Sequence, residues 1–220
     1  MAWAIENGDN IKGMIFDMDG TLLDSMEGCI KIASDVLKDF GVSDFSLSDA
    51  ADGMSMEDIL CALATKNSLS APIDEVEKAM ESELIKAYQT DFPLKNGAFE
   101  YLSYLHENKI KTAIATANFK SIAKAAAVRL GIDKFIDFYV EIGDVNAGKD
   151  KPDVYLLAAE KMELPSSLCC VCEDILTGIK SAKAGGFKAL AIFDKSNEKH
   201  TKELKSAADY YINDWRALPY

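Results

Sequence analysis

The spacing of hydrophobic residues divides the chain into a helical block and a longer block in which strands alternate with helices. A short apolar run at 12–17 predicts a buried first strand that ends in a carboxylate. From about residue 26 to 89, apolar positions recur three or four residues apart, as on the buried face of a helix. We expect three helices there, over about 26–40, 55–63 and 73–89. Pro93 interrupts this pattern.

The first of these helices has a signal at each end. Asp24, with Glu27 three residues later, resembles a capping box, in which two side chains satisfy free N–H groups of the first turn. Gly41 follows the last apolar position and is typical of a helix stop. We therefore expect the helix to begin directly after Asp24 and to end before Gly41.

Beyond Pro93, short apolar runs alternate with amphipathic segments. The runs that predict strands are 111–116, 138–142, 168–173, 188–193 and 209–212. The segments that predict helices are 98–105, 119–130, 152–162 and 175–184. This alternation is typical of a parallel sheet, and nearly continuous apolar runs indicate strands that are covered on both faces. We predict an α/β protein, with a Rossmann-like parallel sheet, helices on both faces and an inserted α-helical cap domain.

The helical block interrupts the α/β pattern directly after the first strand. We predict an α/β catalytic core made of 1–25 and 91–220, with 26–90 as the inserted helical cap. The two chain crossings, near Asp24 and at 91–93, are expected to act together as a hinge.

Composition and charge exclude several classes of function. The 220 residues carry 24 basic and 36 acidic side chains, a net charge of −12, and two of the basic residues are Arg. Such a chain is poorly suited to nucleic acid or to an anionic membrane surface. Apolar runs are too short to span a membrane, and residues 1–6 lack the basic start of a secretory signal. We expect a cytoplasmic protein with neither nucleic-acid nor membrane partners.

The five cysteines point to buried thiols. Cys169, Cys170 and Cys172 crowd one apolar run, and neighbours on a strand are badly placed to join distant loops. No second group of ligands has the spacing of a metal site. We expect reduced, buried thiols, as in a cytoplasmic protein.

Chemically active residues are concentrated where the predicted strands end. Asp17 and Asp19 leave the first strand two residues apart, and Gly20 follows them. Adjacent carboxylates repel each other unless a cation lies between them. Gly20 permits an unusual turn, in which successive N–H groups cradle an anion. The carboxyl ends of parallel strands are also where ligands bind in α/β sheets.

Two further strand ends lead into polar loops. Thr116, Ala117 and Asn118 open a helix and offer a hydroxyl, an amide and helix N–H groups to an oxyanion. The loop before the helix at 152 offers a cation, Lys149 or Lys151. Standing alone, the first would be an ordinary helix cap and the second a solvated loop.

Glu173 and Asp174 directly follow a fully apolar strand, which is a poor place for two acids that bind nothing. Together the strand ends combine hard oxygen ligands, one Lys and several anion donors, a set that suits Mg²⁺ and a phosphoryl group. A Walker loop and a Gly-x-Ser-x-Gly motif are both absent from the sequence, and His106 and His200 lie in polar segments. Nucleotide binding by a P-loop and Ser-His-Asp hydrolysis are therefore disfavoured.

In order and position, these residues resemble the motifs of the haloacid dehalogenase superfamily of phosphotransferases. The four motifs are 17–21 (Asp-Met-Asp-Gly-Thr), Thr116 with Asn118, Lys149 before 152–153, and 173–174 with 177–178. The resemblance covers about 12–193. The insert before Pro93 is similar to the family's helical cap of the type placed directly after the first strand.

The resemblance implies a Mg²⁺-dependent phosphatase that acts on a small phosphorylated metabolite. Asp17 would be the nucleophile that forms an aspartyl-phosphate, and Asp19 would serve as general acid and then as general base. The implied metal site comprises Asp17, the backbone carbonyl of Asp19, Glu173 and Asp174. The implied phosphoryl site comprises Thr116, Lys149, Gly20, Ala117 and Asn118.

Two positions depart from the family's motifs. Asp150 stands where the third motif often has its first Pro. Lys149 keeps the usual distance to 152–153, but Lys151 competes with it for the same role. Ala117 replaces a residue that is often small and polar, which removes one donor at most.

Other branches of the family fit less well. The dehalogenating branch lacks the second Asp of the first motif, which is present here as Asp19. The phosphonate-cleaving branch needs a desolvated Lys in the cap, whereas the lysines of 26–90 fit solvated helix faces. A non-catalytic binding protein is the alternative from a different class, but its members usually lose a catalytic carboxylate.

The runner-up is a β-phosphoglucomutase-like mutase, whose cap binds a second phosphate. Resembling mutases carry Lys-Gly-x-x-Arg in a cap loop and a His in the first cap helix. The matching stretch here, 52–56, reads Asp-Gly-Met-Ser-Met, and Cys29 occupies the helix position. Because 26–90 contains no Arg, we expect a second phosphate to bind badly and water to be the acceptor.

Overall fold

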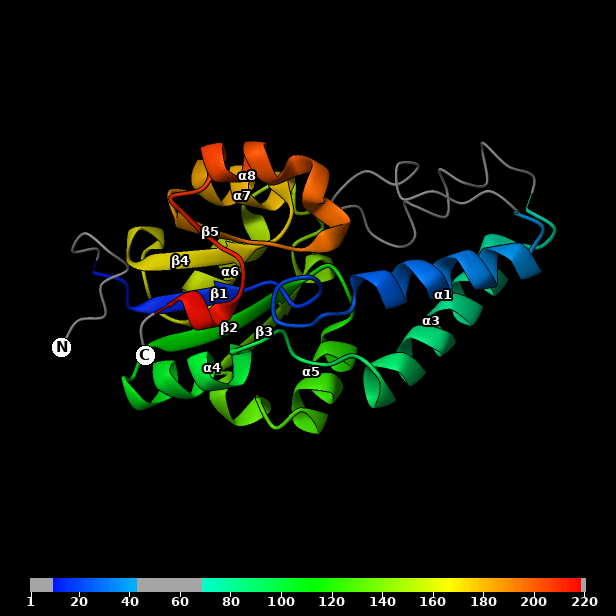
Figure 1. Ribbon diagram of the computed structural model, residues 1–220, viewed down its shortest axis with the longest axis horizontal. Coiled ribbons are helices and arrows are strands. Elements are labelled where there is room, and N and C mark those ends of the chain that lie inside the picture. Colours follow the sequence, from blue (N-terminus) through cyan, green and yellow to red (C-terminus); the bar gives the residue numbers. More distant parts are fainter. Residues whose placement is uncertain (1–9, 43–68, 219–220) are drawn as a thin grey trace.

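The computed structural model describes residues 10–42 and 69–218, and its centre is one parallel sheet. The six strands lie in the order β3-β2-β1-β4-β5-β6 (Figure 1). They are β1 Gly13–Phe16, β2 Lys111–Thr116, β3 Phe138–Glu141, β4 Cys169–Glu173, β5 Lys188–Ile192 and β6 Tyr210–Ile212. The predicted α/β fold with a parallel sheet is thus confirmed, and the observed strands are shorter than expected by at most one residue at either end.

Helices cover both faces of the sheet, because its strands are apolar on both sides. Met14 and Phe16 of β1 pack into one core cluster, whereas Ile15 between them packs into the other. The first cluster lies under α4 Ala98–Glu107 and α5 Lys120–Arg129. The second lies under α6 Asp153–Lys161, α7 Leu176–Ala184 and α8 Thr201–Ala207 (Figure 1).

Short 3₁₀ helices complete the connections. They are η2 Asp133–Phe135, η3 Ile142–Asp144, η4 Ser166–Leu168, η5 Lys195–His200 and η6 Trp215–Ala217. Trp215 is fully buried, with its ring stacked on Tyr101 and its Nε1–H donated to the Thr21 carbonyl at 3.1 Å. The C-terminal segment therefore packs directly against the loop that follows β1.

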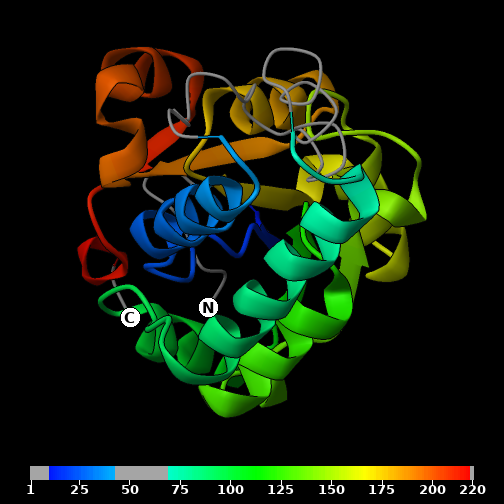
Figure 2. The same cartoon turned by 90° about the vertical axis from the view of Figure 1, so that its right-hand side faces the viewer.

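Two long helices, α1 Met26–Asp39 and α3 Ile73–Thr90, pack against each other and extend beyond the end of the sheet (Figure 1). In the view turned by 90°, α3 lies beside α5 (Figure 2). The helix expected at 55–63 and the stretch 52–56 lie outside the described residues.

The two chain crossings to this helix pair run side by side. The Asp24 N–H donates to the Pro93 carbonyl at 3.0 Å, and the Lys95 N–H donates to the Leu22 carbonyl at 2.8 Å. Leu23 and Leu94 pair between them as an antiparallel bridge. The connections that enter and leave the helix pair are therefore joined by backbone hydrogen bonds.

One local prediction was wrong, and one helix was not predicted. The N-cap of α1 is Ser25 rather than Asp24, and no capping box forms. The Asp24 backbone is bonded to the second crossing, and Glu27 instead forms an ion pair with Lys195 at 2.6 Å. Helix α8 lacks a predictive pattern because Leu204 is its one buried apolar residue.

The described cysteines agree with the expectation of buried thiols. Cys29, Cys169, Cys170 and Cys172 are free, and the three on β4 are fully buried. Among the described residues, no helix has both the length and the apolar character that a membrane crossing needs.

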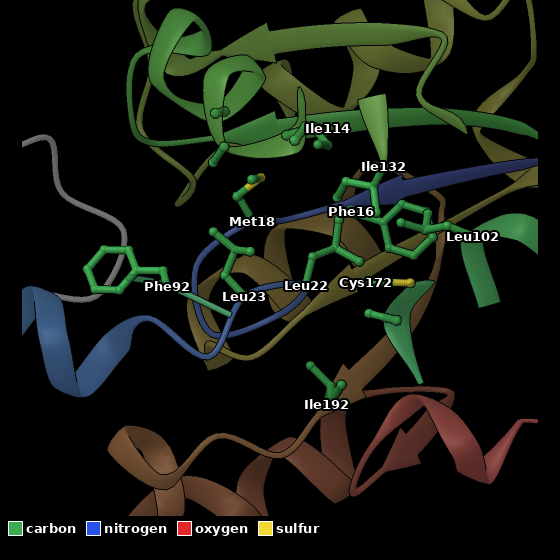
Figure 3. Packing of buried hydrophobic residues seen from close by; sticks show 14 of the residues in the cluster. Phe16, Met18, Leu22, Leu23, Phe92, Leu102, Ile114, Ile132, Cys172 and Ile192 are labelled. Atoms are coloured by element: carbon green, nitrogen blue, oxygen red, sulfur yellow. The ribbon is translucent and has the colours of Figure 1, made fainter. Parts of the chain in front are cut away.

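The loop after β1 is anchored by its own apolar residues. Met18, Leu22 and Leu23 are completely buried and point into the cluster that also holds Phe16 and Cys172 (Figure 3). Because these side chains fill the core, the polar residues between them are held at the edge of the sheet.

Candidate active site

Strand register brings three acidic side chains together. Phe16 of β1 is level with Cys172 of β4, so the next residues along, Asp17 and Glu173, emerge at the same height. The Asp17 N–H continues the ladder to the Cys172 carbonyl at 2.9 Å. Carboxylate oxygens of Asp17, Glu173 and Asp174 all lie within 4.8 Å of one another, and the three residues are buried. We call these three residues the carboxylate corner.

Lys149 balances part of this negative charge. Its Nζ forms an ion pair with Asp17 and donates to Glu173 Oε1 at 2.7 Å, and the residue is 2% exposed. Burial disfavours the charge, but the two carboxylates outweigh it and raise the pKa of Lys149. Lys151 is exposed, so of the two competing lysines it is Lys149 that reaches the carboxylate corner.

The carboxylate corner still holds more negative charge than its neighbours neutralise. Burial, followed by repulsion from Asp17 and Glu173, raises the pKa of Asp174 well above its usual range. Burial likewise raises the pKa of Glu173 to about 7. Glu173 Oε2 is buried without a hydrogen-bond partner. Clustered hard oxygen ligands with an unsatisfied buried atom fit a small divalent cation.

Glycines leave room for these carboxylates. A side chain at Gly178 would meet the Glu173 carboxyl carbon at 2.7 Å, and one at Gly20 would collide with Asp174 Oδ2. Gly20 has a φ of +76°, which favours glycine. Its N–H donates to the Leu23 carbonyl at 3.0 Å and closes the loop. The Gly20 N–H itself is thus engaged within the loop.

Two side chains that the sequence pattern does not single out brace the carboxylate corner. Tyr155 of α6 donates to Glu173 Oε1 at 2.7 Å, and Asn197 Nδ2 donates to Asp174 Oδ2 at 2.8 Å. Asn197 belongs to η5, whose N-cap Asp194 forms a partly buried ion pair with Lys95 at 2.8 Å. The spacing of these residues along the chain carries no signal of this contact.

Asp19 lies at the side of the carboxylate corner nearest α1 and α3. Ser25, the residue before α1, donates its hydroxyl to Asp19 Oδ1 at 2.6 Å. Burial, followed by the negative charge of Asp17, raises the pKa of Asp19 to about 6. A carboxyl group with such a pKa can both donate and accept a proton near neutral pH.

The loop after β2 supplies the expected polar groups, but not all of them face the carboxylates. Thr116 is buried at the strand end, and its Oγ1 accepts the Asn118 N–H at 3.0 Å. Asn118 turns towards α3, where its Nδ2 donates to the Tyr88 hydroxyl at 2.9 Å. Ala117 is half-buried between them. Tyr88 is a further residue of the site that the sequence pattern did not single out.

Comparisons with known proteins agree with this geometry. A model of the haloacid dehalogenase-like hydrolase family matches residues 11–186. The fructose-1-phosphate phosphatase YqaB of Escherichia coli is 30% identical over 182 residues, which cover 82% of this chain and 95% of that protein. Hexitol phosphatase A of the same organism is 29% identical over 191 residues, 82% of each protein.

A solved structure supports the fold. CbbY from Rhodobacter sphaeroides, in complex with xylulose-(1,5)bisphosphate, has a TM-score of 0.81 at 19% identity, covering 93% of this chain and 95% of that one. The family model spans well over half of the chain. The two relatives named above are both phosphatases, and this similarity supports a phosphatase here. Its motifs, its fold and its sequence similarity agree, and the chain belongs to the haloacid dehalogenase-like hydrolase family.

Proposed function

We propose that the protein is a Mg²⁺-dependent phosphatase that hydrolyses small phosphomonoesters, such as sugar phosphates, through an aspartyl-phosphate on Asp17. The observation that carries the proposal is the buried ion pair of Asp17 with Lys149 beside two further carboxylates. An anionic nucleophile and an anionic substrate meet here only if positive charge is supplied. The sugar-phosphate class is favoured by the names of the curated relatives.

The carboxylate corner is the proposed metal site. Asp17, Glu173 and Asp174 would contribute side-chain oxygens and Asp19 its backbone carbonyl. Bound there, Mg²⁺ would neutralise charge on the phosphoryl group as a Lewis acid. The unpartnered Glu173 Oε2 supports this assignment.

The remaining roles concern the phosphoryl group and one proton. Asp17 attacks phosphorus in line, while Thr116 and Lys149 hold the phosphoryl oxygens. Asp19 donates a proton to the leaving oxygen and later removes one from the attacking water. We assign Ala117 and Asn118 to the loop that lines the phosphoryl site.

We also propose that 26–90 is a cap domain on a core of 1–25 and 91–220. The paired crossings at Asp24 and Pro93 support a hinge there, because both connections would bend at the same place. The four described free cysteines favour a reducing compartment such as the cytoplasm.

The experiment that tests this proposal is a phosphate-release assay with Mg²⁺ on hexose, hexitol and nucleoside monophosphates. We expect wild type to release phosphate from at least one sugar phosphate. An Asp17→Asn variant serves as the inactive control and Asp150→Asn, an exposed acid next to Lys149, as the matched active one. Absence of phosphate release from every compound would contradict the proposal.

A second arm separates the phosphatase from the mutase. The protein is incubated with β-glucose 1-phosphate, Mg²⁺ and a trace of the bisphosphate, and glucose 6-phosphate and free phosphate are followed separately. Cys29, which by the resemblance takes the position of a His in mutases, is half-buried on α1. We expect free phosphate to be the main product, and faster formation of glucose 6-phosphate would establish the mutase instead.

A further inference from the structure

Tyr155 carries a fully buried hydroxyl to which the proposed function gives no role. The residue lies in the first turn of α6, and its ring packs edge-on against Phe187, with 6.4 Å between the ring centroids. Its hydroxyl donates to Glu173 Oε1 at 2.7 Å, because an ionised carboxylate can only accept. Buried tyrosine hydroxyls need a partner, so this bond alone would be explained by packing.

The same oxygen of Glu173 accepts from a second donor. Lys149 Nζ donates to Oε1, also at 2.7 Å. Lys149 lies in the loop that leads into α6, so one short segment of chain supplies both donors. Glu173 Oε2, in contrast, is buried and has no hydrogen-bond partner in the described part of the chain. The two hydrogen bonds occupy Oε1 and leave Oε2 as the oxygen that is free to bind a cation.

Gly178 of α7 shows how closely this arrangement is packed. A side chain at this position would meet the Glu173 carboxyl carbon at 2.7 Å and the Tyr155 hydroxyl oxygen at 2.9 Å. The carboxylate and the hydroxyl therefore lie directly under the first turn of α7, with no space for a methyl group between them and the helix. These contacts limit rotation of the carboxylate, in addition to the two hydrogen bonds.

We infer that Tyr155 is a positioning residue that favours Mg²⁺ over Ca²⁺, because its hydroxyl holds Oε1 of Glu173 and leaves the metal a single oxygen of that carboxylate. The inference rests on the metal site of the proposed function. Mg²⁺ demands nearly ideal octahedral geometry, and the two oxygens of one carboxylate lie too close together to fill two corners of an octahedron. Ca²⁺ accepts more oxygens in a flexible geometry and binds carboxylates through one oxygen or through both. A Glu173 that offers one oxygen therefore withholds a ligand that Ca²⁺ would use and that Mg²⁺ does not need.

The test measures the affinities of Mg²⁺ and Ca²⁺ for the whole chain by titration calorimetry, in wild type and in Tyr155→Phe. The substitution keeps the ring against Phe187 and removes the hydroxyl alone. Outer partners of metal ligands are typically worth about 10–100-fold in affinity. We expect Mg²⁺ to bind about tenfold more weakly, and Ca²⁺ to bind at least as tightly as in wild type, because Glu173 is then free to offer both oxygens. The ratio of the two affinities should shift towards Ca²⁺ by about tenfold or more.

A matched variant controls for the loss of a buried hydroxyl. Tyr139→Phe removes another tyrosine hydroxyl that donates to a carboxylate, that of Asp133 at 2.9 Å, and it should leave both affinities unchanged. Thermal unfolding of each variant establishes that it is folded. A purely structural role of Tyr155 would weaken both cations alike, so the ratio of affinities separates the two roles.

A crystal structure of the wild-type protein with Ca²⁺ gives an independent readout, and it decides if Tyr155→Phe does not fold. We expect Glu173 to contact Ca²⁺ through Oε2 alone, with Oε1 still bonded to Tyr155 and Lys149. Contact through both oxygens at about 2.3–2.6 Å, through Oε1 or through neither would overturn the inference.

An unchanged ratio of affinities in Tyr155→Phe, including equal losses for both cations, would also overturn the inference while leaving the phosphatase proposal intact. A wild-type protein that binds neither cation and releases no phosphate contradicts the proposed function itself. The two failures are therefore distinguishable.

Discussion

The two sides of the site are built in different ways. The carboxylate corner consists of Asp17, Glu173 and Asp174, which leave two adjacent parallel strands and are buried with Lys149. Asp19, by contrast, accepts a hydrogen bond from Ser25, the residue just before α1. Sheet register therefore positions the first side, whereas the segment that leads into α1 positions the second. Movement of α1 would change the surroundings of Asp19 and leave the carboxylate corner in place.

The largest expected effect comes from the nucleophile. Asp17→Asn should eliminate turnover and the covalent intermediate together, because an amide neither attacks phosphorus nor retains the charge that pairs with Lys149. The measurement is acid-quenched trapping of label from a ³²P-labelled substrate, with Asp150→Asn as the control that keeps labelling. Near-normal rates in Asp17→Asn would show that the nucleophile lies elsewhere.

Removal of the divalent cation should have a comparable effect. Three buried carboxylates within 4.8 Å repel a phosphate dianion, so chelation should abolish turnover. Mg²⁺ should restore activity, and Ca²⁺ should do so poorly because it is larger and less strict in geometry. The readout is phosphate release before and after metal addition. Full activity in excess chelator would exclude a metal role for the carboxylate corner.

A smaller loss should follow from changing the other side of the site. Asp19→Asn removes the proton donor and should lower kcat by about 10²–10⁴-fold. Metal affinity should stay close to wild type, because Asp19 is proposed to bind the cation through its backbone carbonyl. Titration calorimetry with Mg²⁺ measures this affinity independently of turnover. A collapse of Mg²⁺ binding in this variant would erase the distinction between the two sides.

The smallest expected effect concerns the brace on Asp174. Asn197→Ala removes the amide that donates to Asp174 Oδ2 at 2.8 Å and frees that carboxylate to rotate. Such outer partners are typically worth about 10–100-fold in metal affinity. The same calorimetric titration tests this, with Asn213→Ala, an exposed asparagine, as the control. Unchanged Mg²⁺ affinity would mean that strand register alone holds the ligand in place.

Individual residues show which features of the structure the sequence pattern predicts. The strand expected at 111–116 is β2 with the same bounds, because five consecutive buried residues follow Lys111, as in a strand covered on both faces. Asp17, Glu173 and Asp174 were predicted to converge because each follows such a strand at its carboxyl end. The capping box at Asp24 was wrong, since a tertiary hydrogen bond to Pro93 engages the Asp24 backbone.

The local spacing of apolar residues is sufficient to predict the parallel sheet and the convergence of its acidic strand ends. Both depend on the hydrophobic period and the strand direction, which are properties of short segments. The choice of Lys149 over Lys151, the brace from Asn197 and the contact of Tyr88 with Asn118 depended on how distant segments pack. Each of these contacts joins residues more than twenty positions apart. Spacing along a chain carries no record of such contacts, since they form only when helices and loops dock on the finished sheet.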